Sequence, residues 1–174
     1  MNQQVFEPAM RRSLELALNG PAHGVNPQVG AVILDEDLNI IAEGWHQGAG
    51  TPHAEVMALS NLSDTYGSNP PANLTAVVTL EPCNHTGSTG PCVQAIIDAG
   101  ITTVVYAVAD PNEKAAGGAA ALRAAGVTVV EGVLKDEAAF SNRAWLMKIR
   151  KNRPFFTWKV AATLDGKVAA ADGT

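Results

Sequence analysis

The sequence has no apolar run of about 18 residues, the length that a membrane-spanning helix needs, and no basic segment followed by an apolar core at its start. It also has neither of the two common glycine-rich phosphate loops, GxGxxG and GxxxxGKS/T. We therefore expect a cytoplasmic protein that makes no membrane contact and holds no nucleotide through such a loop.

Basic residues are missing from the long segment between Arg12 and Lys114, and the net charge is −5. Proteins that bind nucleic acid neutralise its phosphates with Lys and Arg, so nucleic acid is not expected as a partner. Five of the 12 basic residues lie instead between Arg143 and Arg153. The favoured interpretation of this cluster is a solvated helix end and linker, with a binding patch as the alternative.

Cysteine is scarce, since the 174 residues include only Cys83 and Cys92, each directly after a proline in "LEPCNHTGSTGPC". A chain of this length buries about 68–70% of its unfolded surface, so it can fold without disulfides. In a reducing compartment, isolated cysteines are more often catalytic, metal-binding or simply buried than disulfide-bonded.

Short apolar strands alternate with helical segments, which indicates an α/β layered sheet. We expect strands over 74–80, 102–109 and 127–132, with a hairpin formed by 29–34 and 39–45. Helices are expected over 6–19, 53–62, 91–99 and 115–125, and from about 135 into "KIRKNRP".

The basic run and Pro154 suggest a boundary between a domain over 1–150 and a remainder over 151–174. The remainder begins like a strand and a turn, but some twenty residues cannot form a domain of their own.

The two cysteines can bind one zinc ion only if the chain between them turns back. Sulfurs on one zinc are at most about 4 Å apart, whereas nine residues of continuous helix would span roughly 13 Å. The glycines of "NHTGSTG" permit the turn, and Cys92 then falls in the first turn of the next helix, where the positive end of the helix dipole stabilises a thiolate.

The segment "PHAEV" offers the best third ligand, His53, with Glu55 two residues on at the start of a helix. His-x-Glu followed by Pro-Cys and a second Cys is the pattern of zinc deaminases, although the cysteine gap here is eight residues rather than two. Three protein ligands leave one position for a water whose pKa zinc lowers, and Glu55 would carry its proton to a ring nitrogen and then to the departing amine.

Simpler interpretations exist for each part of this pattern. A single histidine is most often a hydrogen-bonded residue, and two cysteines are most often small buried side chains. Glu81 could be the acid in place of Glu55, but it more plausibly orients the loop. The joint occurrence of both motifs at strand-to-helix junctions favours the zinc site.

Four segments, "NPQVGAVI", "GWHQGAGTPHAEVMAL", "VTLEPCNHTGSTGPC" and "VADPN", resemble the N-terminal deaminase domain of the bifunctional riboflavin-biosynthesis deaminase/reductase family. The resemblance implies a cytidine deaminase-like three-layer α/β/α sandwich with a central mixed sheet. It also implies hydrolytic deamination of 2,5-diamino-6-ribosylamino-4(3H)-pyrimidinone 5′-phosphate, one Zn²⁺ per chain and a homo-oligomer.

Matched residue by residue, the resemblance assigns the zinc to His53, Cys83 and Cys92 and the proton transfer to Glu55. Positions associated with substrate binding are Asn26, His46, Ala54, His85, Asp110 and Asn112. For Asp110 and Asn112, ordinary turn chemistry in "DPN" is an equally good interpretation.

The tail from "RPFFTWKV" onward resembles the opening strand of the family's reductase domain, so NADP(H) is expected to bind only where the rest of that domain is present. Two other classes of function remain open. One is a zinc deaminase of other bases, nucleosides or tRNA, and the second is a non-catalytic module whose structural metal is closed by His46 or His85.

Ser88 stands where the resembling family commonly has Arg or Lys. If this position faces the substrate phosphate, Ser88→Arg should lower KM for the phosphorylated substrate about tenfold, which is ~1.4 kcal/mol, with little change for the dephosphorylated analogue. The check is KM for both substrates at low and high salt in both proteins. An equal effect on the two substrates, or none, would show that position 88 does not face the phosphate.

Overall fold

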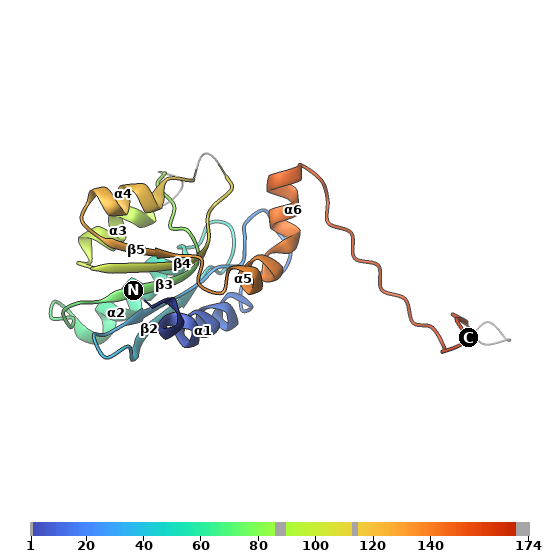
Figure 1. The fold of residues 1–174 in the computed structure, drawn as a ribbon, viewed down its shortest axis with the longest axis horizontal. Coiled ribbons are helices and arrows are strands. Elements are labelled where there is room, and N and C mark those ends of the chain that lie inside the picture. The colour runs from blue at the N-terminus through green and yellow to red at the C-terminus, as the bar shows by residue number, and fades with distance from the viewer. Residues whose placement is uncertain (1, 86–89, 113–114, 170–174) are drawn as a thin grey trace.

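A mixed five-stranded sheet forms the centre of the protein in the computed structural model, which describes residues 2–85, 90–112 and 115–169 (Figure 1). The strands are β1 (Gly30–Leu34), β2 (Ile40–Trp45), β3 (Thr75–Leu80), β4 (Thr103–Val108) and β5 (Thr128–Glu131). They lie in the order β2-β1-β3-β4-β5, with β1 antiparallel to β2 and β3, and with β3, β4 and β5 parallel. The predicted α/β class and the predicted hairpin are confirmed.

Helices cover both faces of this sheet. They are η1 (Gln3–Phe6), α1 (Glu7–Ala17), α2 (Ala54–Tyr66), α3 (Cys92–Asp98), α4 (Gly118–Ala124), α5 (Lys135–Ser141) and α6 (Arg143–Lys151). α3 contacts both α2 and α4, whereas an ion pair of 2.6 Å between Arg11 and Glu137 joins α1 to α5. Figure 1 shows α3 and α4 on one side of the sheet and α1 and α5 on the other, which gives the expected three layers. No helix among the described residues is long and apolar enough to cross a membrane.

The central strands are buried along their whole length because helices cover both of their faces. All residues of β1 and β3 are buried, among them Val32 and Val77 with no exposed surface. Strands with no alternation of buried and exposed residues are typical of the inside of a layered α/β protein. These strands provide the rigid base from which the loops at the candidate site emerge.

Two glycines let helices pack closely on the sheet. A Cβ atom at Gly44 of β2 would lie 2.4 Å from the Ala58 backbone nitrogen in α2, and one at Gly30 of β1 would lie 1.9 Å from the Ser13 carbonyl oxygen in α1. Any larger residue at either position would push a helix away. The close contact at Gly44 therefore fixes the distance between α2 and β2.

A predicted single helix from about residue 135 is broken at Asn142 into α5 and α6. The buried Asn142 side chain accepts a hydrogen bond from the Gln28 backbone nitrogen (3.0 Å) and donates one to the Gln28 carbonyl oxygen (2.8 Å). This pair fixes the corner between the helices to the segment that enters β1. Elsewhere α2 runs four residues past Leu62, and α4 starts at Gly118 rather than at 115.

The strand predicted after Pro154 is not formed. Residues 153–163 adopt neither helix nor strand and are exposed, and Figure 1 shows this tail running away from the sheet. A strand needs a hydrogen-bonded neighbour, and no strand of the described chain lies beside this segment. The predicted turn does form, since the Thr163 nitrogen donates to the Lys167 carbonyl oxygen and the Gly166 nitrogen to that of Thr163.

Candidate active site

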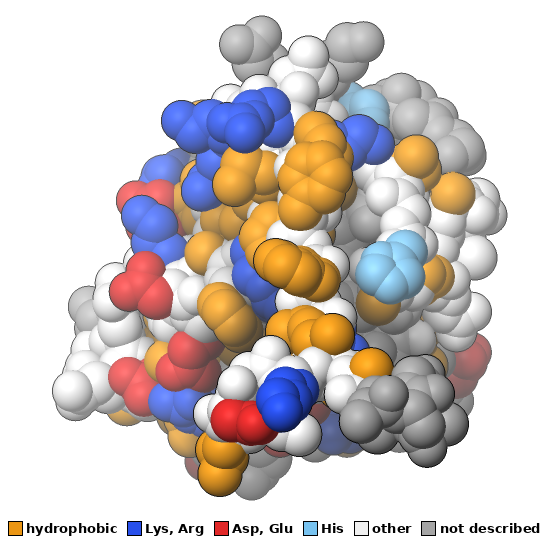
Figure 2. Space-filling model, turned by 90° about the vertical axis from the view of Figure 1, so that its right-hand side faces the viewer, with side chains coloured by type: hydrophobic (Ala, Val, Ile, Leu, Met, Phe, Trp, Pro, Cys, Tyr) orange, Lys and Arg blue, Asp and Glu red, His pale blue; other side chains and the backbone are white. Residues whose placement is uncertain are grey.

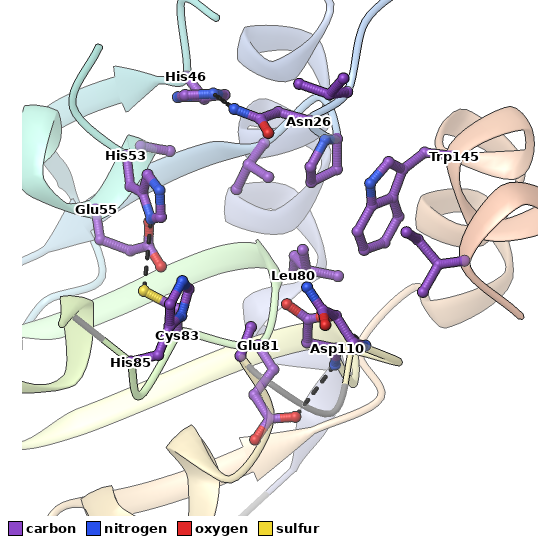
Figure 3. A pocket seen from close by; sticks show the side chains of 17 residues that line it. Asn26, His46, His53, Glu55, Leu80, Glu81, Cys83, His85, Asp110 and Trp145 are labelled. Carbon is purple, nitrogen blue, oxygen red and sulfur yellow. Dashed lines mark hydrogen bonds between the residues drawn. The ribbon is translucent and has the colours of Figure 1, made fainter. Parts of the chain in front are cut away.

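Three side chains that can bind a metal meet where β3 ends and where α2 and α3 begin. His53 is the N-cap of α2, Cys92 is the first residue of α3, and Cys83 lies three residues after β3. Their ligand atoms all lie within 4.8 Å of one another, and Figure 3 shows His53 facing Cys83. The Cys92 backbone nitrogen donates to the Cys83 sulfur at 3.5 Å, so the chain between the cysteines does turn back.

The spacing of these atoms suits a tetrahedral zinc ion. The Nδ1 atom of His53 lies 3.2 Å from the Cys92 sulfur and 3.5 Å from the Cys83 sulfur. Zinc bonds of ~2.3 Å to sulfur and ~2.0 Å to nitrogen, at a tetrahedral angle, separate the two ligand atoms by about 3.5 Å. Neither cysteine forms a disulfide. The donor atoms and these two distances therefore fit a zinc ion.

The charges of the cluster also suit a divalent cation. Hydrogen bonds from the Cys92 thiol and from His53 lower the pKa of Cys83 to about 3. For Cys92, the hydrogen bond that its thiol makes with Cys83, together with burial, raises the pKa well above its usual range. The hydrogen bond to Cys83 raises the pKa of His53. One thiolate thus forms readily, whereas a second beside it needs added positive charge such as a zinc ion brings.

Glu55 lies in the first turn of α2, buried beside the metal cluster. Only 4% of its surface is exposed, and Figure 3 shows its carboxyl group next to His53. Burial raises the pKa of this carboxyl above its ordinary value. A carboxyl group whose pKa is raised by burial is suited to act as a general acid and base.

A cavity of about 280 Å³ opens onto the cluster. Its walls include His53, Glu55, Cys83 and all six residues assigned to substrate binding, which are Asn26, His46, Ala54, His85, Asp110 and Asn112. Cys92 is fully buried next to Cys83. Asn26 and Asn112, which are 86 positions apart in the sequence, thus share one pocket.

His46 is held in one orientation by two hydrogen bonds. Its Nδ1 atom lies 3.0 Å from the Pro52 carbonyl oxygen, to which it donates, so its Nε2 atom accepts from the Asn26 amide at 3.0 Å. Both ring nitrogens are therefore engaged, which argues against His46 as a fourth metal ligand. For His85, the buried Nδ1 atom has no hydrogen-bond partner among the described residues.

Asp110 and Asn112 form a turn and also face the pocket. The Asp110 carboxylate accepts from the Asn112 backbone nitrogen at 2.8 Å, as expected for an Asx-turn, and burial raises the pKa of that carboxyl. The two interpretations of "DPN" are thus compatible, because the turn aims both side chains at the cavity.

Glu81 links the end of β3 to the turn at Asp110 and to the start of α4 through its buried carboxylate. One oxygen accepts from the Ala119 backbone nitrogen at 2.9 Å. The other accepts from the Asp110 backbone nitrogen at 3.2 Å (Figure 3). These bonds hold the turn at Asp110 and the start of α4 against the end of β3. The geometry supports the expectation that Glu81 orients the loop.

Replacing Glu81 by glutamine should lower the free energy of unfolding by about 1–3 kcal/mol, because an amide nitrogen would face a backbone N–H and leave it unpaired. Denaturant unfolding of Glu81→Gln beside Glu36→Gln, a change at an exposed glutamate, measures this loss. Unchanged stability together with a loss of turnover of more than hundredfold would instead make Glu81 the catalytic acid.

Trp145 and Ile149 of α6 also line the cavity and were not predicted as site residues. They lie four positions apart, so they share one face of the helix, and Figure 3 shows Trp145 facing the pocket opposite the metal cluster. Their spacing marks an apolar helix face, but that pattern is the same for a helix that only packs on a core. Ser88 and Lys114 lie outside the described residues.

Comparison with known proteins decides the family. Residues 3–108 match the model of the cytidine and deoxycytidylate deaminase zinc-binding region. The chain belongs to this zinc deaminase family. It corresponds to the N-terminal deaminase domain of riboflavin biosynthesis proteins, as shown by 50% identity over 149 residues to the riboflavin biosynthesis protein RibD of Mycobacterium tuberculosis. That match covers 85% of this chain and 42% of the relative.

Solved structures show the same relation. A diaminohydroxyphosphoribosylaminopyrimidine deaminase/5-amino-6-(5-phosphoribosylamino)uracil reductase from Thermotoga maritima matches with a TM-score of 0.92 and 41% identity, over 98% of this chain and 48% of the other. The Rib2 deaminase of Aspergillus oryzae matches with a TM-score of 0.67 and 29% identity, over 83% of this chain and 93% of the other. The chain thus spans about half the length of the bifunctional relatives it matches.

Proposed function

We propose that the chain catalyses the hydrolytic deamination of 2,5-diamino-6-ribosylamino-4(3H)-pyrimidinone 5′-phosphate to 5-amino-6-ribosylaminouracil phosphate and ammonia, a step of riboflavin biosynthesis. The observation that carries this proposal is the cluster of His53, Cys83 and Cys92 beside the buried Glu55 on the wall of one polar cavity. The relatives named above, one of which is a deaminase for a diaminohydroxyphosphoribosylaminopyrimidine, favour this substrate over other pyrimidines.

In this proposal His53, Cys83 and Cys92 hold one zinc ion per chain, in agreement with the donor atoms and their spacing. When bound, zinc supplies a Lewis acid that brings the pKa of water close to neutrality. The open side of such a three-ligand site would face the cavity, because His53 and Cys83 line it.

Glu55 moves the protons. It takes a proton from the attacking water and gives it to the ring nitrogen. It then takes the proton of the hydroxyl that has added to the ring carbon and gives it to the leaving amine. Its burial raises its pKa, which favours the protonated form that a general acid needs. The substrate ring must therefore lie with its amine-bearing carbon beside Glu55.

The remaining walls would bind the substrate. The Asn26 amide, the Asp110 carboxyl group and the His85 ring offer donors and acceptors for a polar pyrimidine and a ribose. His46 would act by holding Asn26 in position, because its Nε2 atom accepts from the Asn26 amide.

We further propose that residues 1–150 form the deaminase domain, and that 151–174 are a linker and the beginning of a reductase-like domain. NADP(H) binding then belongs to that second domain and is not expected of this chain. A cytoplasmic homo-oligomer acting on a small molecule, with neither nucleic acid nor a membrane as partner, completes the proposal.

A deaminase of cytidine or deoxycytidylate is the second candidate, favoured by the name of the family whose model matches residues 3–108. Ammonia release by the zinc-loaded chain from the phosphorylated diaminopyrimidine, cytidine and guanine, each at equal concentration, separates the two. The proposal predicts the highest kcat/KM for the diaminopyrimidine. A higher kcat/KM for cytidine would replace it with the second candidate.

A further inference from the structure

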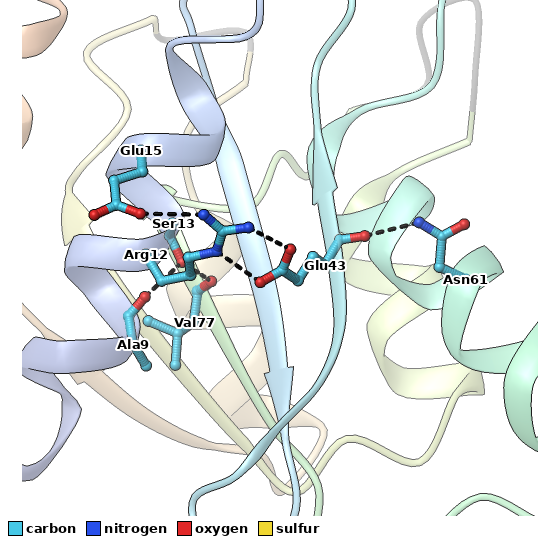
Figure 4. Close-up of polar contacts among 7 residues, drawn as sticks. All are labelled: Ala9, Arg12, Ser13, Glu15, Glu43, Asn61 and Val77. Carbon is cyan, nitrogen blue, oxygen red and sulfur yellow. Dashed lines mark hydrogen bonds and ion pairs between the residues drawn. The ribbon is translucent and has the colours of Figure 1, made fainter.

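The proposed substrate carries a phosphate dianion, but no Lys or Arg lines the cavity in the described part of the chain. Arg12 is occupied elsewhere, since it donates to both carboxylate oxygens of Glu43 at 2.7 and 2.8 Å and to Glu15 at 3.1 Å (Figure 4). Arg11 is likewise paired with Glu137. Among the described residues, a cation for the phosphate therefore has to come from outside the walls of this cavity.

A second hollow of about 210 Å³ adjoins the cavity and shares two wall residues with it, Asn26 and Trp145. Its described walls include one lysine, Lys148, and no arginine, together with His23 and Ser141. Lys148 follows Trp145 by three residues of α6, so both lie on one side of the helix. Figure 2 shows the side of the molecule that carries α6 and the tail, where Lys and Arg side chains gather beside a stripe of hydrophobic ones.

Two polar side chains at this hollow, Lys148 and Ser141, have no hydrogen-bond or ion-pair partner among the described residues. Lys148 is exposed and forms no ion pair or hydrogen bond with a described residue. The Ser141 hydroxyl is buried and has no partner among the described residues. Arg143, by contrast, donates to the Phe140 carbonyl oxygen at 2.8 Å and lies over the Phe140 ring at 4.2 Å. Lys148 is therefore the cation of α6 that faces the hollow without a partner.

We infer that this hollow is the subsite for the 5′-phosphate, with Lys148 as its cation; the inference rests on the proposed function. The pyrimidine ring occupies the end of the cavity beside Glu55, the ribose passes between Asn26 and Trp145, and the phosphate reaches the hollow. Lysine is suited to this role as a point charge for phosphate. Helix α6 lies beyond residues 3–108, which the family model matches, so this subsite is an addition to the common zinc deaminase region.

The test is the ratio of kcat/KM for the phosphorylated substrate to kcat/KM for its dephosphorylated riboside. Lys148→Gln should lower this ratio about tenfold, mainly through KM of the phosphorylated substrate, and Lys148→Arg should restore most of it. Added salt should lower the ratio in the unchanged protein and have less effect in Lys148→Gln, because salt screens an exposed charge.

Lys151→Gln is the matched control, since it removes the same charge from the same helix at a position outside both sets of cavity walls. A ratio that falls equally in Lys148→Gln and Lys151→Gln would mean a general effect of charge and would overturn the subsite. Lys114 is the rival cation, because it follows Asn112 by two residues and lies outside the described chain. A fall of the kcat/KM ratio in Lys114→Gln, with no fall in Lys148→Gln, would likewise overturn the Lys148 subsite.

A binding measurement separates this inference from the proposed function. Titration with ribose 5-phosphate, followed by phosphorus NMR, should give a dissociation constant about tenfold weaker in Lys148→Gln than in the unchanged protein. Ribose 5-phosphate binding that depends on Lys148, together with no deamination of the diaminopyrimidine, would contradict the proposed function alone. Equal binding in both proteins would contradict the subsite, whatever the activity.

Discussion

Glu55→Gln should retain its zinc while losing deamination by about 10²–10⁴-fold or more, because a positioned proton shuttle contributes that much to the rate. The side chain keeps its size and stays buried, and Glu55 is not one of the three grouped metal-binding residues. The loss should appear in kcat, because Glu55 transfers protons in the transition state whereas other residues of the cavity bind the substrate. Metal analysis and steady-state kinetics on the same preparation measure both quantities.

Glu36→Gln is the control for this change, because it makes the same replacement at an exposed position. It should have unchanged zinc content and kcat. Turnover by Glu55→Gln within tenfold of the unchanged protein would contradict the mechanism, and loss of zinc from that variant would show that Glu55 helps to hold the metal.

Cys83→Ser and Cys92→Ser should each lose most of the bound zinc and, with it, nearly all deamination. Each change removes one of only three protein ligands, and a serine hydroxyl is a far weaker zinc ligand than a thiolate. Metal binding also stabilises the folded state, so the zinc-dependent rise in the unfolding temperature should shrink in both variants.

The matched control is Ala115→Ser, which places a hydroxyl against the same two cysteines without removing a sulfur. Its zinc content should stay near one per chain. Full zinc content in either cysteine variant would show that the metal is held by other groups. Zinc loss in Ala115→Ser equal to that in the cysteine variants would show that the site responds to any change in packing.

The sequence was enough to predict the sheet and the convergence of the metal-binding residues. Buried strands such as 74–80 are short, largely apolar runs rich in Val and Thr, whose pattern depends little on distant contacts. The turn between the cysteines follows from bond lengths once both are taken as ligands of one zinc ion, because a helix of nine residues would hold their sulfurs too far apart. The sequence left two roles open for Glu81, catalytic acid or loop orientation. The structure shows its hydrogen bonds from the backbone nitrogens of Asp110 and Ala119.

The contribution of α6 could not be predicted in this way. Its position depends on the Asn142 side chain, which breaks the helix and pairs with the backbone of Gln28, 114 residues earlier in the chain. No local pattern encodes such a pairing. The strand after Pro154 fails for a related reason, since its apolar pattern predicts a strand but the described chain offers no neighbour for it.

The most direct measurement of the central claim is the fate of the phosphorylated diaminopyrimidine when it is incubated with the zinc-loaded chain in heavy-oxygen water. Mass spectrometry of the product and an ammonia assay follow the reaction together. The proposed function predicts that an amine nitrogen of the ring is replaced by oxygen from the solvent, with ammonia released in equal amount. Recovery of the unchanged pyrimidine from zinc-loaded, folded protein would contradict it.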